Sequence, residues 1–145
     1  MNKLSHFDAQ GKIKMVDVSA KETTSRQAIA SAKVLLNAET LETLKTQTNP
    51  KGNPLEIARI AGIMAAKKCS ELIPLCHQIN LSKADVRAEL TNYGVYLEAE
   101  AKTNSNTGVE MEALTAVFGA GLSIFGICED AAEDNGITEI QLELK

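Results

Sequence analysis

The chain has 145 residues, of which 44% are hydrophobic and 23% charged, and its formal net charge is −4 at pH 7. This length and composition predict a single domain over residues 1–145 with a hydrophobic core. The acidic balance argues against nucleic acid as a partner, because phosphate backbones require a basic surface. Three cysteines without a pairing pattern indicate a reducing cytoplasm, and no apolar run reaches the ~20 residues of a bilayer-spanning helix.

The N-terminal half of the sequence predicts a polar arm, a short strand and helical segments. Residues 1–14 are mostly polar and form the expected arm. Residues 15–19 alternate apolar and polar side chains, which predicts a strand. Apolar residues recur at helical spacing in three segments, over residues 26–37, 39–46 and 55–70. Asn53 followed by Pro54 is typical of a helix N-terminus and predicts where the third helix begins. The apolar residues of that helix hold to one side: Ile57, Ala58, Ile60, Ala61, Met64 and Ala65.

The C-terminal half predicts a hairpin, a long helix and a last strand. Residues 81–91 and 93–103 alternate apolar and polar side chains, with Asn92 and Gly94 as turn residues between them. The remaining elements are a helix over residues 109–132, ended by Asn135-Gly136, and a strand over residues 137–144. The resulting βαββαβ order predicts an α+β, ferredoxin-like sandwich: an antiparallel sheet with helices on one face and an extra N-terminal helix.

Small residues occupy much of the long helix. Glycine inside a helix costs about 0.5–1 kcal/mol relative to alanine, so a helix that accepts several is expected to pack closely against a neighbour or another subunit. These residues are Ala113, Ala116, Gly119, Ala120, Gly121 and Gly126.

Two carboxylates stand where the long helix begins. Glu110 and Glu112 differ by about 200° of helical rotation, so they cannot share one face of a regular helix, although both can lean into the space before its first turn. Thr107 with Glu110 also matches a capping box, which is a structural alternative for that glutamate. The capping alternative does not account for Glu112.

The other candidate groups lie in loops. His77 follows Cys76 between a helix and a strand, where functional loops often lie. A zinc site is not expected, because no CxxC or HxxxH spacing is present and Cys69 is predicted to lie on a different helix face. Lys51 lies in a tight loop, and Lys21 and Arg26 follow the first expected strand. Each of these cations could meet an anionic ligand or simply be solvated.

Four segments together resemble one known family, the cyclic pyranopterin monophosphate synthases of molybdenum cofactor biosynthesis. These segments are residues 15–21, 58–67, 72–77 and 107–116. The resemblance implies a ferredoxin-like subunit in a homohexamer, a trimer of dimers. It implies an enzyme that converts a GTP-derived small molecule, cyclised dihydro-GTP, to cyclic pyranopterin monophosphate and releases pyrophosphate. It implies no resident cofactor and no metal, although Mg²⁺ could accompany the phosphates.

The resemblance also assigns roles by motif position. Lys51 and His77 are the implied catalytic residues. The implied substrate contacts are Lys21, Arg26, Leu75, Cys76, His77, Glu110, Met111, Glu112 and Lys145.

The sequence departs from the family at the end of the long helix. The family carries an Asp and, three residues later, a Lys, where this sequence has Gly126 and Glu129. Gln78 stands where the family has proline. Two hypotheses follow: a working synthase in which Glu129, Asp130 or a group from another subunit replaces the pair, or a catalytically impaired relative that binds a nucleotide, a pterin-like ligand or a partner protein.

Overall fold

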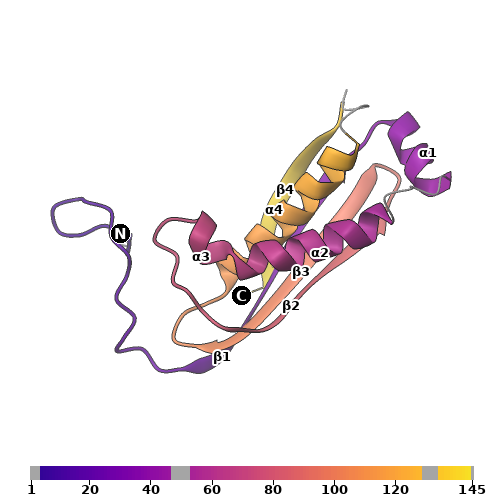
Figure 1. Ribbon diagram of the computed structural model, residues 1–145. Helices are drawn as coiled ribbons and strands as arrows, with labels where there is room; N and C mark the ends of the chain where they lie inside the picture. Colours follow the sequence, from indigo (N-terminus) through magenta and orange to yellow (C-terminus); the bar gives the residue numbers. More distant parts are fainter. Residues whose placement is uncertain (1–3, 47–52, 129–133, 145) are drawn as a thin grey trace.

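The structure is a computed structural model that describes residues 4–46, 53–128 and 134–144. In chain order these residues form β1 (Thr24–Leu35), α1 (Ala38–Thr46), α2 (Pro54–Lys67), α3 (Cys69–Leu72), β2 (Leu81–Leu90), β3 (Gly94–Ser105), α4 (Glu110–Ile127) and β4 (Gly136–Leu144). The strands form one antiparallel sheet in the order β2-β3-β1-β4, and α2 and α4 cover one of its faces (Figure 1). The predicted α+β, ferredoxin-like sandwich with helices on one face is confirmed.

The prediction of a helix over residues 26–37 is wrong, because this segment forms the inner strand β1. The strand pairs with β3 on one side and β4 on the other. Its alternate side chains, Ala28, Ala30, Ala32 and Val34, are fully buried beneath the helices. Apolar residues occur at both odd and even positions, so the segment also fits a helical period, and only pairing with distant strands selects the extended form.

The short strand predicted over residues 15–19 is also wrong. The segment is not part of a sheet ladder and runs along the surface from the N-terminal arm toward β1 (Figure 1). Its contacts are with loops: the Asn106 side-chain amide donates a hydrogen bond of 2.9 Å to the Val18 carbonyl oxygen. Residues 4–14 are almost entirely exposed, as the arm prediction requires.

The hairpin of β2 and β3 confirms the prediction for that region. Alternate residues of β3 are buried: Val95, Leu97, Ala99 and Ala101. Gly94 begins this strand with φ of +147°, and an added Cβ would lie 3.0 Å from the Leu36 backbone nitrogen and closer still to the Val34 carbonyl. This close approach of two backbones explains the glycine.

The helix predicted over residues 55–70 begins as expected but breaks at Lys68 into α2 and α3. The Asn53 side chain accepts a hydrogen bond from the Leu55 N–H, with Pro54 in the first turn. The buried face of α2 consists of Ala58, Gly62 and Ala66. Ile60 and Met64 have longer apolar side chains and are about half exposed. The largest side chains of the predicted apolar face therefore do not pack into the core.

Close contact with α4 explains this choice of face. An added Cβ on Gly62 would lie 2.8 Å from the Ala116 carbonyl oxygen, and one on Gly119 would lie 2.6 Å from the Ala65 Cβ. The predicted tight packing of small residues is therefore confirmed for this part of α4. It is wrong for Gly126, which is exposed with open space where a Cβ would be.

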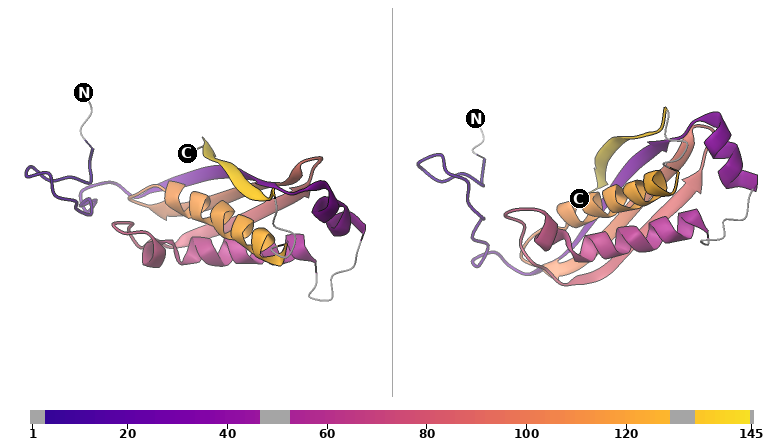
Figure 2. Two further views of the ribbon diagram at one scale, coloured as in Figure 1. Left: turned by 90° about the horizontal axis from the view of Figure 1, so that it is seen from above. Right: turned by 45° about the horizontal axis from the view of Figure 1, so that its top comes forward.

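Helix α4 is the centre of the helical layer. It ends at Ile127, several residues before the predicted end at residue 132, and residues 129–133 lie outside the described part of the chain. Among the described residues it is the one helix whose length and composition would allow it to span a membrane. It lies flat on the sheet, and the views in Figure 2 show it beside α2 on the same face. Seven of its residues are buried there, which is the behaviour of a core helix.

Candidate functional site

The loop after α3 turns the chain back toward the start of α4. Leu75 has a φ of +66°, a left-handed conformation that is uncommon for a residue with a branched side chain. The turn places Cys76 over the first turn of α4. Further along, the Thr103 hydroxyl of β3 donates a hydrogen bond to the Asn80 carbonyl oxygen, which ties the end of the loop to the sheet.

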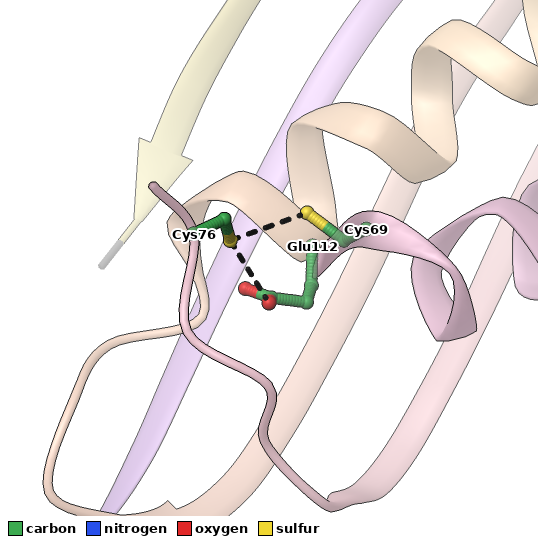
Figure 3. Close-up of side chains that lie close together, drawn as sticks. All are labelled: Cys69, Cys76 and Glu112. Atoms are coloured by element: carbon green, nitrogen blue, oxygen red, sulfur yellow. Dashed lines mark hydrogen bonds between the residues drawn. The ribbon is translucent and has the colours of Figure 1, made fainter. Parts of the chain in front are cut away.

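Three side chains from separate segments converge at this point. The Cys76 Sγ lies 3.7 Å from the Cys69 Sγ and 3.7 Å from a Glu112 carboxylate oxygen. Figure 3 shows the three side chains pointing toward one another from α3, the following loop and α4. The expectation that Cys69 lies on a different helix face is wrong, because the break at Lys68 redirects the chain and brings Cys69 to the cluster.

Burial governs the protonation of this cluster. Glu112 is 3% exposed, and this burial raises the pKa of its carboxyl above the ordinary value of 4.5. Burial, followed by the negative charge of Glu112, raises the pKa of the Cys76 thiol to about 12. Burial also raises the pKa of Cys69, whose sulfur lies 3.4 Å from the Thr115 hydroxyl oxygen. Both thiols are therefore protonated at neutral pH, and neither is an activated nucleophile.

His77 borders the same cluster. It lines a pocket of about 460 Å³ together with Cys69 and Glu112. Its Nε2 hydrogen-bonds the Val16 carbonyl oxygen. A carbonyl can only accept, so Nε2 carries the proton and Nδ1 of the neutral ring is the nitrogen that can take up another.

The unpaired segment over residues 15–19 also forms part of the surroundings of His77. It lines a second pocket of about 490 Å³ with His77 and Asn106. Within the segment, the Ser19 backbone N–H and then its hydroxyl lower the pKa of the Asp17 carboxyl, with a smaller effect from the nearby His77. Residues 15–19, which do not form the predicted strand, thus place the Asp17 carboxylate near the His77 imidazole.

Glu110 faces a different pocket from Glu112. It lines a space of about 400 Å³ together with Arg26, whose Nε donates a hydrogen bond of 3.4 Å to the Ser105 carbonyl oxygen. The capping-box alternative for Glu110 is wrong, because Val109 occupies the N-cap position and its apolar side chain cannot accept a hydrogen bond. Glu110 instead folds its carboxylate back over Gly108.

The remaining predicted site residues divide into two groups. Met111 is 39% exposed on the first turn of α4, and Lys21 is exposed beyond the surface segment. Lys51, Glu129, Asp130 and Lys145 lie outside the described residues. Within one protomer, the structure thus gathers Cys76, His77 and Glu112 around one cluster, with Glu110 and Arg26 around a neighbouring pocket.

Two participants were missed by sequence reasoning. The assumption of a continuous helix over residues 55–70 excludes Cys69, and Asp17 is not among the predicted site residues. The sequence signal for Cys69 was its distance of seven residues from Cys76 across a segment containing Pro74, which a continuous helix does not accommodate. Asp17 had no local signal, because its position beside His77 depends on a surface segment with no regular structure.

In this α+β sandwich a thiol, a buried carboxylate and an imidazole line one pocket, and a second thiol lies beside the carboxylate. These are the features of a small-molecule enzyme subunit. Comparison with known proteins gives the particular assignment. Residues 15–145 match the MoaC family, and the chain belongs to that family.

Individual relatives agree along the whole chain. A cyclic pyranopterin monophosphate synthase of Desulfatibacillum aliphaticivorans is 47% identical over an alignment of 147 positions, which covers 100% of this chain and 92% of that protein. One of Chloroflexus aurantiacus is 44% identical, with 99% of this chain and 90% of that protein covered. A mitochondrial one of Arabidopsis thaliana is 43% identical over 100% of this chain and 54% of its own length.

Proposed function

We propose that this protein is a cyclic pyranopterin monophosphate synthase of molybdenum cofactor biosynthesis. It converts cyclised dihydro-GTP to cyclic pyranopterin monophosphate and releases pyrophosphate. The observation that carries the proposal is the convergence of two family motifs in a chain 47% identical to a protein of that name. His77 and Glu112 line one pocket, and the Cys76 sulfur lies 3.7 Å from a Glu112 carboxylate oxygen.

The chemistry of these groups fits a rearrangement of heterocycles. Opening and reclosing rings requires proton donors and acceptors within reach of the substrate. A buried Glu112 with a raised carboxyl pKa can hold a proton closer to neutral pH than an exposed glutamate. His77 offers Nδ1 as an acceptor, because its Nε2–H is held by Val16. Arg26, Lys21, Lys51 and Lys145 are the proposed partners of the triphosphate.

We propose that the working form is a homohexamer built as a trimer of dimers. Glu112 and Gly126 stand 14 residues apart on α4, or about 21 Å along the helix axis. A site that uses both ends of α4 therefore has to combine groups from two protomers. Four large apolar side chains on the outer sides of α2 and α4 are about half exposed, which supports subunit contact there. They are Ile60, Met64, Phe118 and Leu122.

We further propose a single domain acting in the cytoplasm. The proposed reaction uses no resident cofactor, and Mg²⁺ is the cation expected with the substrate phosphates. The substrate is a soluble triphosphate, and nucleic acid and membrane are not partners. The acidic net charge of −4 supports the exclusion of nucleic acid.

One observation favours a second candidate function. Gly126 offers no proton-transfer group where the family carries an acid, and Glu129 reverses the charge of the family's lysine. General acid–base groups contribute roughly 10²–10⁴-fold each, so their loss favours an impaired relative that binds a nucleotide, a pterin-like ligand or a partner protein.

Turnover of cyclised dihydro-GTP by the unmodified chain tests the first candidate directly. We expect pyrophosphate release that is abolished in His77→Ala. The matched control is His6→Ala, which removes the other histidine, exposed on the N-terminal arm. No pyrophosphate release by the unmodified chain, with heat of binding to a GTP analogue in calorimetry, would favour the second candidate.

A further inference from the structure

The cluster of Cys69, Cys76 and Glu112 shares two residues with the proposed substrate site, and its third member, Cys69, has no role in the proposed reaction. One ligand atom from each residue lies within 4.8 Å of the other two. The residues are buried or half-buried, and they are supplied by α3, the following loop and α4. We propose that these three side chains form a binding site for a thiophilic divalent cation of the zinc class.

Two of the three distances within the cluster agree closely with tetrahedral coordination, and the third is at most 4.8 Å. Two sulfur ligands about 2.3 Å from Zn²⁺ stand about 3.8 Å apart in a tetrahedron, and a sulfur and a carboxylate oxygen stand about 3.6 Å apart. The two sulfurs are 3.7 Å apart, and the Cys76 sulfur is 3.7 Å from the Glu112 oxygen. A cation at the centre therefore needs little rearrangement of these side chains.

The ligand types select the metal. Two thiolates and one carboxylate suit Zn²⁺ and exclude Mg²⁺ and Ca²⁺, which prefer oxygen ligands only. Three protein ligands leave one tetrahedral position open. Cys69 and Glu112 both line the pocket of about 460 Å³ that His77 borders, so this position is available to water or to an anionic ligand from that pocket.

Binding has a defined proton balance. Two metal–sulfur bonds and one metal–oxygen bond to Glu112 form, and bound waters leave the hydrated cation. The two thiol protons, together with the Glu112 proton where that carboxyl is protonated, pass to solvent, and the oxidation state of the metal does not change. The thiols resist ionisation in the metal-free protein because they are buried beside Glu112. The cation offsets this negative charge, and its affinity should fall steeply as the pH is lowered.

Cobalt serves as a spectroscopic probe of the reduced, metal-free protein. One equivalent of Co²⁺ per chain should produce thiolate-to-cobalt charge-transfer bands and the intense visible bands of tetrahedral cobalt, and Zn²⁺ should displace it. Loss of a ligand should weaken Zn²⁺ binding by more than about tenfold in both Cys69→Ser and Cys76→Ser. The matched control is Cys128→Ser, which removes the third, buried cysteine and should leave binding unchanged. Absence of the charge-transfer bands at one equivalent, or their persistence at full intensity in Cys69→Ser, would overturn the proposal.

A second measurement avoids core substitutions altogether. In the unmodified chain, one equivalent of Zn²⁺ should slow alkylation of Cys76 by more than about tenfold, because a metal-bound thiolate is shielded. Peptide mapping distinguishes this cysteine from Cys128, whose slow labelling serves as the internal reference. An unchanged alkylation rate of Cys76 would also overturn the proposal.

Discussion

The Cys76 thiol lies 3.7 Å from the Glu112 carboxylate, which comes from a segment 36 residues further along the chain. The contact joins the loop after α3 to the first turn of α4. Because Glu112 is almost completely buried, its ionisation lowers the stability of the protein as well as changing the chemistry of the pocket.

Glu112→Gln should change the dependence of stability on pH. The folded-state pKa of Glu112 is raised above the ordinary 4.5, so its favourable contribution is complete below pH 4.5 and is lost as the pH rises through the raised value. The melting temperature of the variant relative to the unmodified chain should therefore increase from acidic to neutral pH and then level off. The melting temperature should rise by about 2–4 °C for each kcal/mol that the unmodified chain spends on burying the Glu112 charge.

Thermal melts between about pH 4 and pH 8 measure this difference. Glu42→Gln, which removes an exposed carboxylate on α1, is the control and should show a much smaller change with pH. Parallel curves for the unmodified chain and Glu112→Gln would contradict the assigned burial effect.

Restoring the family's residues at the end of α4 should raise synthase activity. An added Cβ at Gly126 meets nothing within 4 Å, so the backbone there accepts a side chain. We expect Gly126→Asp combined with Glu129→Lys to increase the rate of pyrophosphate release by roughly 10²-fold or more, as expected for a restored acid–base group. Gly126→Ala combined with Glu129→Lys is the control that supplies the lysine without the acid. Equal rates for both double variants would show that the carboxylate has no role.

Two glycines of the helical layer should respond in opposite directions to substitution by alanine. A Cβ at Gly62 would lie 2.7 Å from the Val86 side chain and 2.8 Å from the Ala116 carbonyl oxygen. The second neighbour is backbone and cannot turn away, so Gly62→Ala should destabilise the protein by about 1–3 kcal/mol despite its better helix propensity.

Gly126→Ala brings the same gain in helix propensity without a steric clash. It should raise the free energy of unfolding by up to about 1 kcal/mol. Urea denaturation gives the free energy of unfolding of both variants and of the unmodified chain. A stabilising Gly62→Ala would mean that α2 and α4 lie further apart than the structure has them.

Gly94→Ala should damage the start of β3. The residue has a φ of +147°, and an added Cβ would overlap the Val34 carbonyl of the neighbouring strand. We expect a loss of more than about 2 kcal/mol in the free energy of unfolding. Gly136→Ala at the start of β4 is the matched control, since a Cβ there meets nothing within 4 Å. If these two variants had comparable free energies of unfolding in urea, the close contact of the Gly94 backbone with Val34 of β1 would be excluded.

The candidate site was only partly predictable. The motifs carrying Cys76, His77 and Glu112 were recognisable, because each is a short local pattern in the sequence. The resemblance assigns Cys76 and Glu112 to the same substrate. Cys69 was excluded in error, since a helix assumed to continue over residues 55–70 hides the break at Lys68. Asp17 beside His77 was not predictable from local spacing at all.

The sequence by itself determined the elements whose pattern is unambiguous over a short range. These are the alternating hairpin of β2 and β3, helix α1, the start of α2 after Asn53, and the long apolar helix α4. Only the tertiary structure decided that β1 is an inner strand and that α2 buries its small residues. In both segments alanine and larger apolar residues satisfy more than one period. The choice therefore belongs to the partners packed against them: two strands beside β1, and the backbone of α4 against Gly62.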